Sequence, residues 1–123
     1  MAVFDHLGLS VSDYAQSKAF YEKVLAPLGI TVMTEGEGWC LLGRMHEGHL
    51  WLGRYGTLTA PIHIAFSAKT RADVRAFYEA ALAAGAKDNG KPGIRAQYHP
   101  NYYGAFVLDR DGHNIEAVCH MPE

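Results

Sequence analysis

The stretch that decides the fold occurs twice, as HLGLSVSDYAQSKAFYEKVL at residues 6–25 and as HIAFSAKTRADVRAFYEAAL at residues 63–82. The copies align without a gap at an offset of 63 minus 6, or 57 residues, and both contain the tripeptide FYE. Each copy opens on a histidine, His6 or His63. An ungapped internal repeat of this length predicts two copies of one supersecondary unit.

Each copy predicts a strand followed by a helix. The apolar runs at 3–11 and 61–68 are typical of strands, and apolar residues then recur at three- and four-residue steps, as on one face of a helix. Polar residues and glycines mark where the two helices begin and end. The expected N-caps are Ser12 or Asp13 and Thr70, and the expected C-terminal glycines are Gly29 and Gly85.

Three short apolar segments follow each helix, separated by glycines and polar turns, and we expect them to be strands. They cover residues 31–34, 39–44, 49–54, 94–98, 105–109 and 114–120. Each half is therefore a predicted βαβββ module, and the fold class is α+β. One such module has an apolar face that it cannot bury alone. We expect one domain over 1–123, with module one at about 1–56 and module two at about 60–123, joined near 55–61.

Composition excludes several classes of function. The chain has 123 residues and a net charge of -2, and its lysines and arginines form no run, which argues against a nucleic-acid partner. No apolar stretch approaches the roughly 20 residues of a membrane span, and the N-terminus has no basic segment typical of a secretion signal. Cys40 and Cys119 lie in apolar runs without metal-binding spacing. We expect a soluble, cytoplasmic protein with reduced thiols.

One residue interrupts the last predicted strand. The sequence LDRDGHNIEAV at 108–118 predicts a polar turn at 109–112 and then a strand in which Glu116 stands between Ile115 and Ala117. When GHLWL at 48–52 is placed over GHNIE at 112–116, Glu116 corresponds to Leu52. An apolar residue at the same place in the other copy indicates that the fold does not need the carboxylate.

His6, His63 and Glu116 together have the composition of a metal site. Taken singly, each is more often a structural residue, but two histidines open equivalent strands and the carboxylate lacks a structural reason. Imidazole and carboxylate ligands suit one divalent ion of Zn, Fe, Mn, Ni or Co, and three ligands leave positions for substrate. His113 either holds Glu116 in place or belongs to a solvated turn.

The segment QYHPNYYGAF at residues 97–106 concentrates donors and titratable groups just before the Glu116 hairpin. His99 and Tyr102 are candidates for a general acid or base, and Asn101 and Tyr103 for contacts with substrate. The alternative is a surface turn whose tyrosine rings cover the sheet. In module one the candidate substrate-binding residues are Trp39, Arg44 and His49, although an indole can equally fill the core and Arg44 can face water.

Two βαβββ modules, a histidine opening each, and the ending FVLDRDGHNIEAV at 106–118 resemble the vicinal oxygen chelate superfamily. It includes glyoxalase I, fosfomycin-resistance thiol transferases, extradiol dioxygenases and bleomycin-sequestering proteins. The resemblance implies a cupped, barrel-like mixed sheet around a metal site, with the helices outside. It also implies His6, His63 and Glu116 as the metal ligands, and a homodimer in which modules pair across chains.

The resemblance further implies a metal-dependent lyase, isomerase or dioxygenase that binds a small oxygenated substrate through two oxygens. Leu52 stands where glyoxalase I has a fourth ligand, and Gly8 stands where the fosfomycin enzymes have threonine. Most extradiol dioxygenases are about twice as long. The rival class is a metal-independent protein that sequesters an aromatic or cationic drug, and a third possibility is a metal site with a regulatory role.

Overall fold

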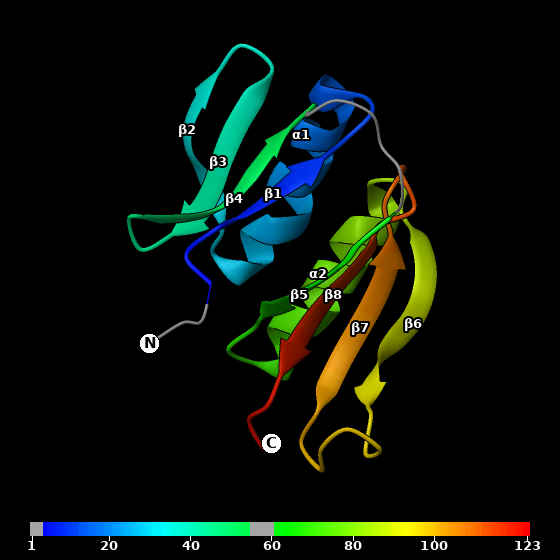
Figure 1. Cartoon of the computed structure of the whole chain (residues 1–123). Helices are drawn as coiled ribbons and strands as arrows, with labels where there is room; N and C mark the ends of the chain where they lie inside the picture. The colour runs from blue at the N-terminus through cyan, green and yellow to red at the C-terminus, as the bar shows by residue number, and fades with distance from the viewer. Residues whose placement is uncertain (1–3, 55–60) are drawn as a thin grey trace. The chain divides into compact units, whose positions relative to one another are not determined.

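The computed structural model describes residues 4–54 and 61–123, so most of the predicted join at 55–61 and the first residue of the strand predicted at 3–11 lie outside the described residues. The chain divides into two compact units, Met1–Ala60 and Pro61–Glu123, which are drawn in Figure 1 and considered separately below. No described helix is long and apolar enough to cross a membrane.

The first unit has the order βαβββ, with a short 3-10 turn, η1, after its helix. Its elements are β1 Leu7–Ser10, α1 Tyr14–Leu25, η1 Ala26–Leu28, β2 Thr31–Gly36, β3 Trp39–Arg44 and β4 Glu47–Gly53. The sheet order is β1-β4-β3-β2, and β1 runs parallel to β4. Asp13 is the N-cap of α1, because its carboxylate accepts the backbone N–H of Gln16.

The second unit repeats this architecture. Its elements are β5 His63–Ser67, α2 Arg71–Ala83, β6 Lys87–Ile94, β7 Tyr103–Leu108 and β8 Asn114–Cys119. The sheet order is β5-β8-β7-β6, again with the first strand parallel to the last. Thr70 caps α2 by accepting the N–H of Asp73, and α2 begins 71 minus 14, or 57 residues, after α1. The two βαβββ modules predicted from the repeat are therefore confirmed.

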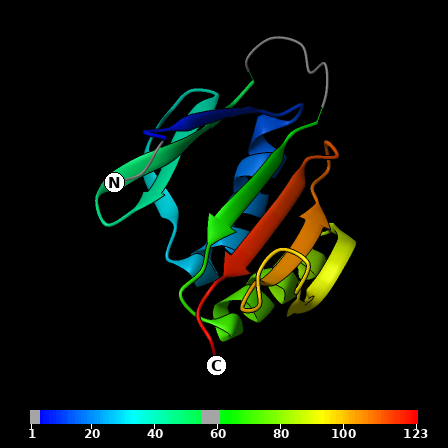
Figure 2. The same ribbon diagram turned by 60° about the horizontal axis from the view of Figure 1, so that its bottom comes forward.

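Helix α2 covers one face of the second sheet, as Figures 1 and 2 show. Tyr103 lies on that face, since its hydroxyl accepts a hydrogen bond from Arg75 of α2. Tyr103 pairs directly with Cys119, so Cys119 and Ala117 point to the helix side as well. Because side chains alternate along a strand, Glu116 points to the face opposite α2.

The prediction of a strand at 94–98 is wrong. The structure instead forms β6 over Lys87–Ile94, and the following residues make a hydrogen-bonded turn. The sequence of β6, KDNGKPGI, contains two glycines and a proline, residues that disfavour the interior of a strand. It is tolerated because β6 is an edge strand whose register with β7 shifts between Asp88 and Gly90 and again between Gly90 and Gly93.

The structure corrects the equivalence of Glu116 with Leu52. Gly8 of β1 pairs with Trp51, and its repeat partner Ala65 of β5 pairs with Glu116, so the first-unit equivalent of Glu116 is Trp51. Leu52 is fully buried and occupies the position of Ala117. A slip of one residue in a strand exchanges its two faces.

The two Gly-His pairs used for that alignment are not equivalent. Gly48 lies within β4 opposite Gly43, next to a register shift after Leu42. Gly112 lies in the turn before β8 with φ +82°, and its N–H donates to the carbonyl of Asp109. The bulge in the first hairpin has no counterpart in the turn of the second.

The predicted closure into a barrel-like sheet also needs correction. The described strands form two separate four-stranded sheets, the first with β1 and β2 at its edges and the second with β5 and β6. Strand pairing therefore ends within each unit and does not make a closed barrel. The α+β class and the tandem βαβββ arrangement stand.

Candidate functional site

Glu116 is the centre of a polar cluster in the second unit. Its side chain comes from β8, one of the two inner strands of the sheet, and is only 1% exposed. Oε1 lies 2.9 Å from Nε2 of His63, and Oε2 accepts a hydrogen bond from the hydroxyl of Tyr102. Three residues proposed from the sequence for metal binding and catalysis are thus brought into direct contact.

The local sequence explains how these side chains meet. Gly104 stands beside the Tyr102–Glu116 hydrogen bond, and a Cβ there would lie 3.2 Å from the Tyr102 ring and 3.3 Å from Glu116 Oε2. Glycine therefore leaves the room that the hydrogen bond occupies. The preceding turn is closed by a 2.7 Å hydrogen bond from the N–H of Arg95 to the carbonyl of Tyr102, which fixes where the phenol projects.

Tyr102 is set up as a proton donor. Burial raises the pKa of its phenol well above the ordinary value, and the hydrogen bond to Glu116 raises this pKa further, since both favour the neutral form. The hydroxyl is therefore protonated at neutral pH and donates to the carboxylate.

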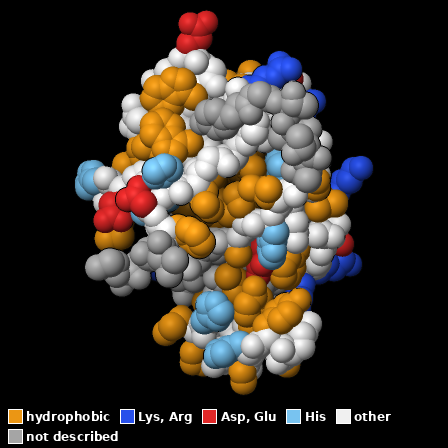
Figure 3. Space-filling model, viewed as in Figure 1, with side chains coloured by type: hydrophobic (Ala, Val, Ile, Leu, Met, Phe, Trp, Pro, Cys, Tyr) orange, Lys and Arg blue, Asp and Glu red, His pale blue; other side chains and the backbone are white. Residues whose placement is uncertain are grey.

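Aromatic and imidazole rings surround this donor. The Tyr102 ring lies 5.2 Å from the ring of His120 and 5.1 Å from that of Tyr98, and His120 lies 5.6 Å from His99. Nδ1 of His99 accepts the backbone N–H of Asn101, so these two candidates share one turn. Figure 3 shows histidines among hydrophobic side chains on the face of the second unit turned to the viewer.

Sequence reasoning missed His120. Its signal is its spacing, because it stands four residues after Glu116 in the same strand direction, a separation that returns a side chain to the same face. From the sequence it is predicted only as the last residue of the strand at 114–120.

Other predicted residues lie elsewhere. Tyr103 is on the α2 side of the sheet, where its ring lies beneath the guanidinium of Arg71 at 5.2 Å, so it is not with Glu116. Arg44 donates to the carbonyl of Leu28 at the end of η1. Nδ1 of His49 lies 3.3 Å from the backbone oxygen of Asp5.

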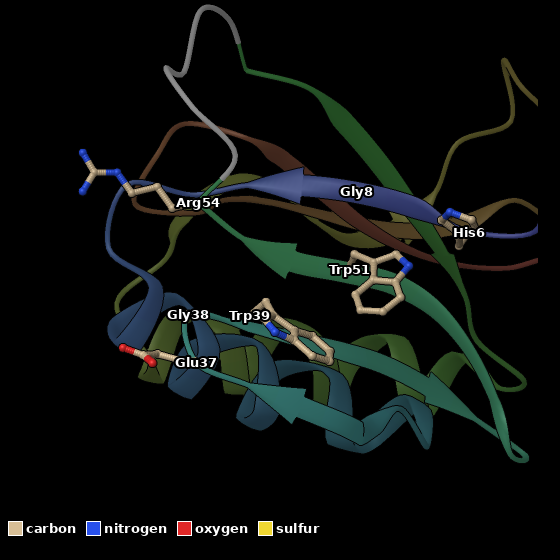
Figure 4. Close-up of a pocket in the computed structure, with 7 residues that line it drawn as sticks. All are labelled: His6, Gly8, Glu37, Gly38, Trp39, Trp51 and Arg54. Atoms are coloured by element: carbon tan, nitrogen blue, oxygen red, sulfur yellow. The ribbon is translucent and has the colours of Figure 1, made fainter.

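The first unit contains a cavity of about 680 Å³, shown in Figure 4. Its lining residues are His6, Gly8, Glu37, Gly38, Trp39, Trp51 and Arg54. It joins the predicted metal ligand His6 to the predicted substrate contact Trp39, and adds Trp51, Glu37 and Arg54, which the sequence did not single out as site residues. Because His6 belongs to the first unit, its joining His63 and Glu116 stays a prediction.

The turn before β8 holds a second group of ligand-type side chains. Ligand atoms of Asp109, Asp111 and His113 lie within 4.8 Å of one another. Oδ1 of Asp109 accepts the N–H groups of Asp111 and His113, and Nδ1 of His113 accepts the N–H of Ile62. These bonds stabilise the turn predicted at 109–112, so we regard the group as primarily structural.

The family model for the Glyoxalase/Bleomycin resistance protein/Dioxygenase superfamily matches residues 3–117. The chain belongs to this superfamily. Among curated proteins, no match was found.

Solved structures share the superfamily fold. A glyoxalase/bleomycin resistance protein from Albidiferax ferrireducens T118 is 24% identical with a TM-score of 0.84, and the match covers 96% of this chain and 99% of that one. A glyoxalase/bleomycin resistance protein/dioxygenase family enzyme from Burkholderia phytofirmans PsJN is 17% identical with a TM-score of 0.74, and the match covers 98% of this chain and 100% of that one. A glyoxalase-related enzyme from Fulvimarina pelagi is 17% identical with a TM-score of 0.72, over 96% and 87%. At these identities the likeness supports the fold alone.

Superfamily membership gives the cluster its context. The superfamily includes enzymes, typically binds a metal ion, and binds small molecules. In this member, the residues matching the expected ligands of the second unit are His63 and Glu116.

Proposed function

We propose that this protein is a metal-dependent enzyme that binds a small oxygenated substrate at one divalent ion held by His6, His63 and Glu116. The observation that carries the proposal is the buried Glu116 carboxylate beside the His63 imidazole, on a strand whose repeat copy has Trp51 at the same place. A buried carboxylate without a structural purpose is a candidate for chemistry.

The residues of the second unit fit an ion. Two ligand atoms at about 2.1 Å from one ion, roughly 90° apart, lie about 3 Å from each other. Nε2 of His63 and Oε1 of Glu116 are 2.9 Å apart, and this mixed nitrogen and oxygen set suits Zn, Fe, Mn, Ni or Co. When bound, such an ion supplies Lewis-acid polarisation of substrate oxygens.

The other residues position and transfer protons. The hydrogen bond from Tyr102 orients Oε2 of Glu116, as groups around metal ligands commonly do. Its raised pKa keeps the phenol protonated at neutral pH, so Tyr102 is proposed to act as a hydrogen-bond and proton donor and not as a base. His99, two rings away through His120, is proposed to exchange protons with solvent, while Asn101 supports the turn that holds it.

We further propose that the protein acts as a single-domain homodimer.

Two reaction classes fit the proposed site: isomerase or lyase chemistry, and ring-cleaving oxygenation. Activity assays on metal-free protein that is reloaded with each ion in turn distinguish these two classes. Nickel or zinc with turnover of a glutathione hemithioacetal supports the first class, and iron with oxygen uptake on catechols supports the second. No turnover of either substrate with any of these ions would contradict the enzyme proposal.

A second candidate is metal-independent binding of an aromatic or cationic compound. The observation favouring it is the tryptophan-lined cavity of the first unit, which needs no ion. Saturable binding of such compounds by chelator-treated protein that never takes up metal would favour it over the enzyme.

A further inference from the structure

The cavity of the first unit has an aromatic floor. Trp39 of β3 and Trp51 of β4 project on the same side of the sheet, with ring centroids 5.1 Å apart and a tilt of 50°. They stand diagonally across neighbouring strands, since Trp51 pairs with Leu41 and Trp39 with Gly53. Two adjoining indoles offer a longer apolar surface than one ring requires.

Glycines at two positions shape this floor. At Gly36 a Cβ would lie 2.5 Å from Nε1 of Trp39, so only glycine lets that indole lie across β2. Gly8 pairs directly with Trp51 and also lines the cavity. A side chain at position 8 would project beside Trp51 on the same face of the sheet, and glycine leaves that space to the cavity.

Polar groups stand at the ends of the cavity. Figure 4 shows His6 at one end, near Trp51, and Arg54 with Glu37 at the other. The volume, about 680 Å³, is typical of pockets for small organic ligands and exceeds what a single six-membered ring needs. Because the indole planes are tilted by 50°, a flat ligand seated here would lay its face on one indole and an edge against the other, with His6 beyond Trp51.

We propose that the first unit binds a flat aromatic ligand of about two fused rings, stacked on one of the two indoles of Trp39 and Trp51 with the other indole against its edge, and with its oxygen-bearing edge toward His6. That this ligand is the substrate rests on the proposed function, in which His6 is a metal ligand. The stacking itself depends only on Trp39, Trp51 and Gly8.

The sequence contains two tryptophans, and both line the cavity, so the indole N–H signals in a nitrogen-15 NMR spectrum report on this place alone. Naphthalene-2,3-diol, catechol and cyclohexane-1,2-diol are titrated into chelator-treated protein and into zinc-loaded protein. We expect both indole signals to shift saturably, with naphthalene-2,3-diol tightest and catechol weaker. Cyclohexane-1,2-diol, which has the two oxygens without a ring face, should bind roughly tenfold or more weakly than catechol.

Two variants and a control locate the binding. Gly8→Val fills the space beside Trp51, and Trp51→Leu removes half of the floor, so each should weaken naphthalene-2,3-diol binding roughly tenfold. Phe20→Leu removes an aromatic ring from α1, where it packs on Tyr21 and does not line the cavity, and should leave the affinity unchanged.

Failure of this inference is separable from failure of the proposed function. If zinc binds but neither indole signal shifts with any aromatic diol, the stacking site is overturned while the metal site stands. If zinc does not bind but the indoles shift and Gly8→Val abolishes the shift, the stacking site stands and the metal site falls. Equal binding of catechol and cyclohexane-1,2-diol overturns the aromatic specificity.

Discussion

Glu116 illustrates how a carboxylate is kept in the interior. At 1% exposure it has lost nearly all of its hydration, and it keeps one hydrogen bond from Tyr102 and a contact with the His63 imidazole. Burying a carboxylate is costly unless such partners are present. The three side chains therefore stabilise one another even before a ligand is considered.

Removing the donor tests this interdependence. Tyr102→Phe leaves Oε2 of Glu116 without its phenol partner, so the free energy of unfolding should fall by about 1–3 kcal/mol. Urea denaturation measures the change. Tyr98→Phe removes a hydroxyl from a neighbouring ring that is 64% exposed, and it should alter stability by less than about 0.5 kcal/mol. Equal effects of the two substitutions would show that the Tyr102 hydroxyl does not support Glu116.

At the scale of single residues, the sequence indicates which side chains depart from a regular pattern. Glu116 was identifiable because it interrupts an apolar strand, and His63 because it opens a repeated one. The hydrogen bond between Tyr102 and Glu116 was not identifiable from the sequence, because it depends on the direction in which the turn after β6 points the Tyr102 ring. The hydrogen bond from Arg44 to the carbonyl of Leu28 was not identifiable either, because the two residues are 16 positions apart.

Among the elements, the helices and their caps were predictable and strand register was less so. Asp13, Thr70, Gly29 and Gly85 act through local hydrogen bonds and φ values, which neighbouring residues largely determine. Register in β4 and β6 depends on bulges, which change the pairing without a clear signal in the sequence. This is why β6 was misplaced and Leu52 was mistaken for the equivalent of Glu116.

The corrected register predicts opposite tolerances at neighbouring positions. Leu52 is fully buried, so Leu52→Glu places a carboxylate in the core and should lower the free energy of unfolding by at least about 3 kcal/mol. Trp51 lines the cavity, so Trp51→Glu should cost at least about 1 kcal/mol less than Leu52→Glu. Thermal or urea unfolding of both variants measures the two losses of unfolding free energy. The reverse order would restore Leu52 as the equivalent of Glu116.

The bulged strand β6 carries a pH-dependent contact. The N–H of Gly90, and then the hydroxyl of Tyr78, hold the pKa of Asp88 below its ordinary value of about 3.9. A lowered folded-state pKa gives stability that is present above about pH 4 and lost as the pH falls through the folded-state pKa.

Asp88→Asn should therefore make the free energy of unfolding fall less steeply than in the wild type below about pH 4. Denaturant midpoints measured from pH 6 to pH 2 test this. Glu79→Gln, an exposed carboxylate on α2, is the matched control and should follow the wild type. Identical profiles for Asp88→Asn and the wild type would remove Asp88 from this role.

At the scale of the molecule, the chain is one architecture used twice with different chemistry on equivalent strands. The faces opposite the helices carry Glu116 with His63 in the second unit and Trp51 beside Gly8 in the first. Sequence predicted the repeat because it is local and ungapped. It did not predict the aromatic cavity, because that requires the paired positions on β1, β3 and β4.

The central proposal is that His6, His63 and Glu116 hold one divalent ion. Elemental mass spectrometry of protein purified without added metal measures it directly, in the wild type, His6→Ala and Glu116→Gln. His46→Asn is the control, because His46 is exposed in a turn with φ +65°, a conformation that asparagine tolerates. We predict about one ion per chain in the wild type and the control, and loss of most of it in both ligand variants. Undiminished metal in Glu116→Gln would contradict the claim.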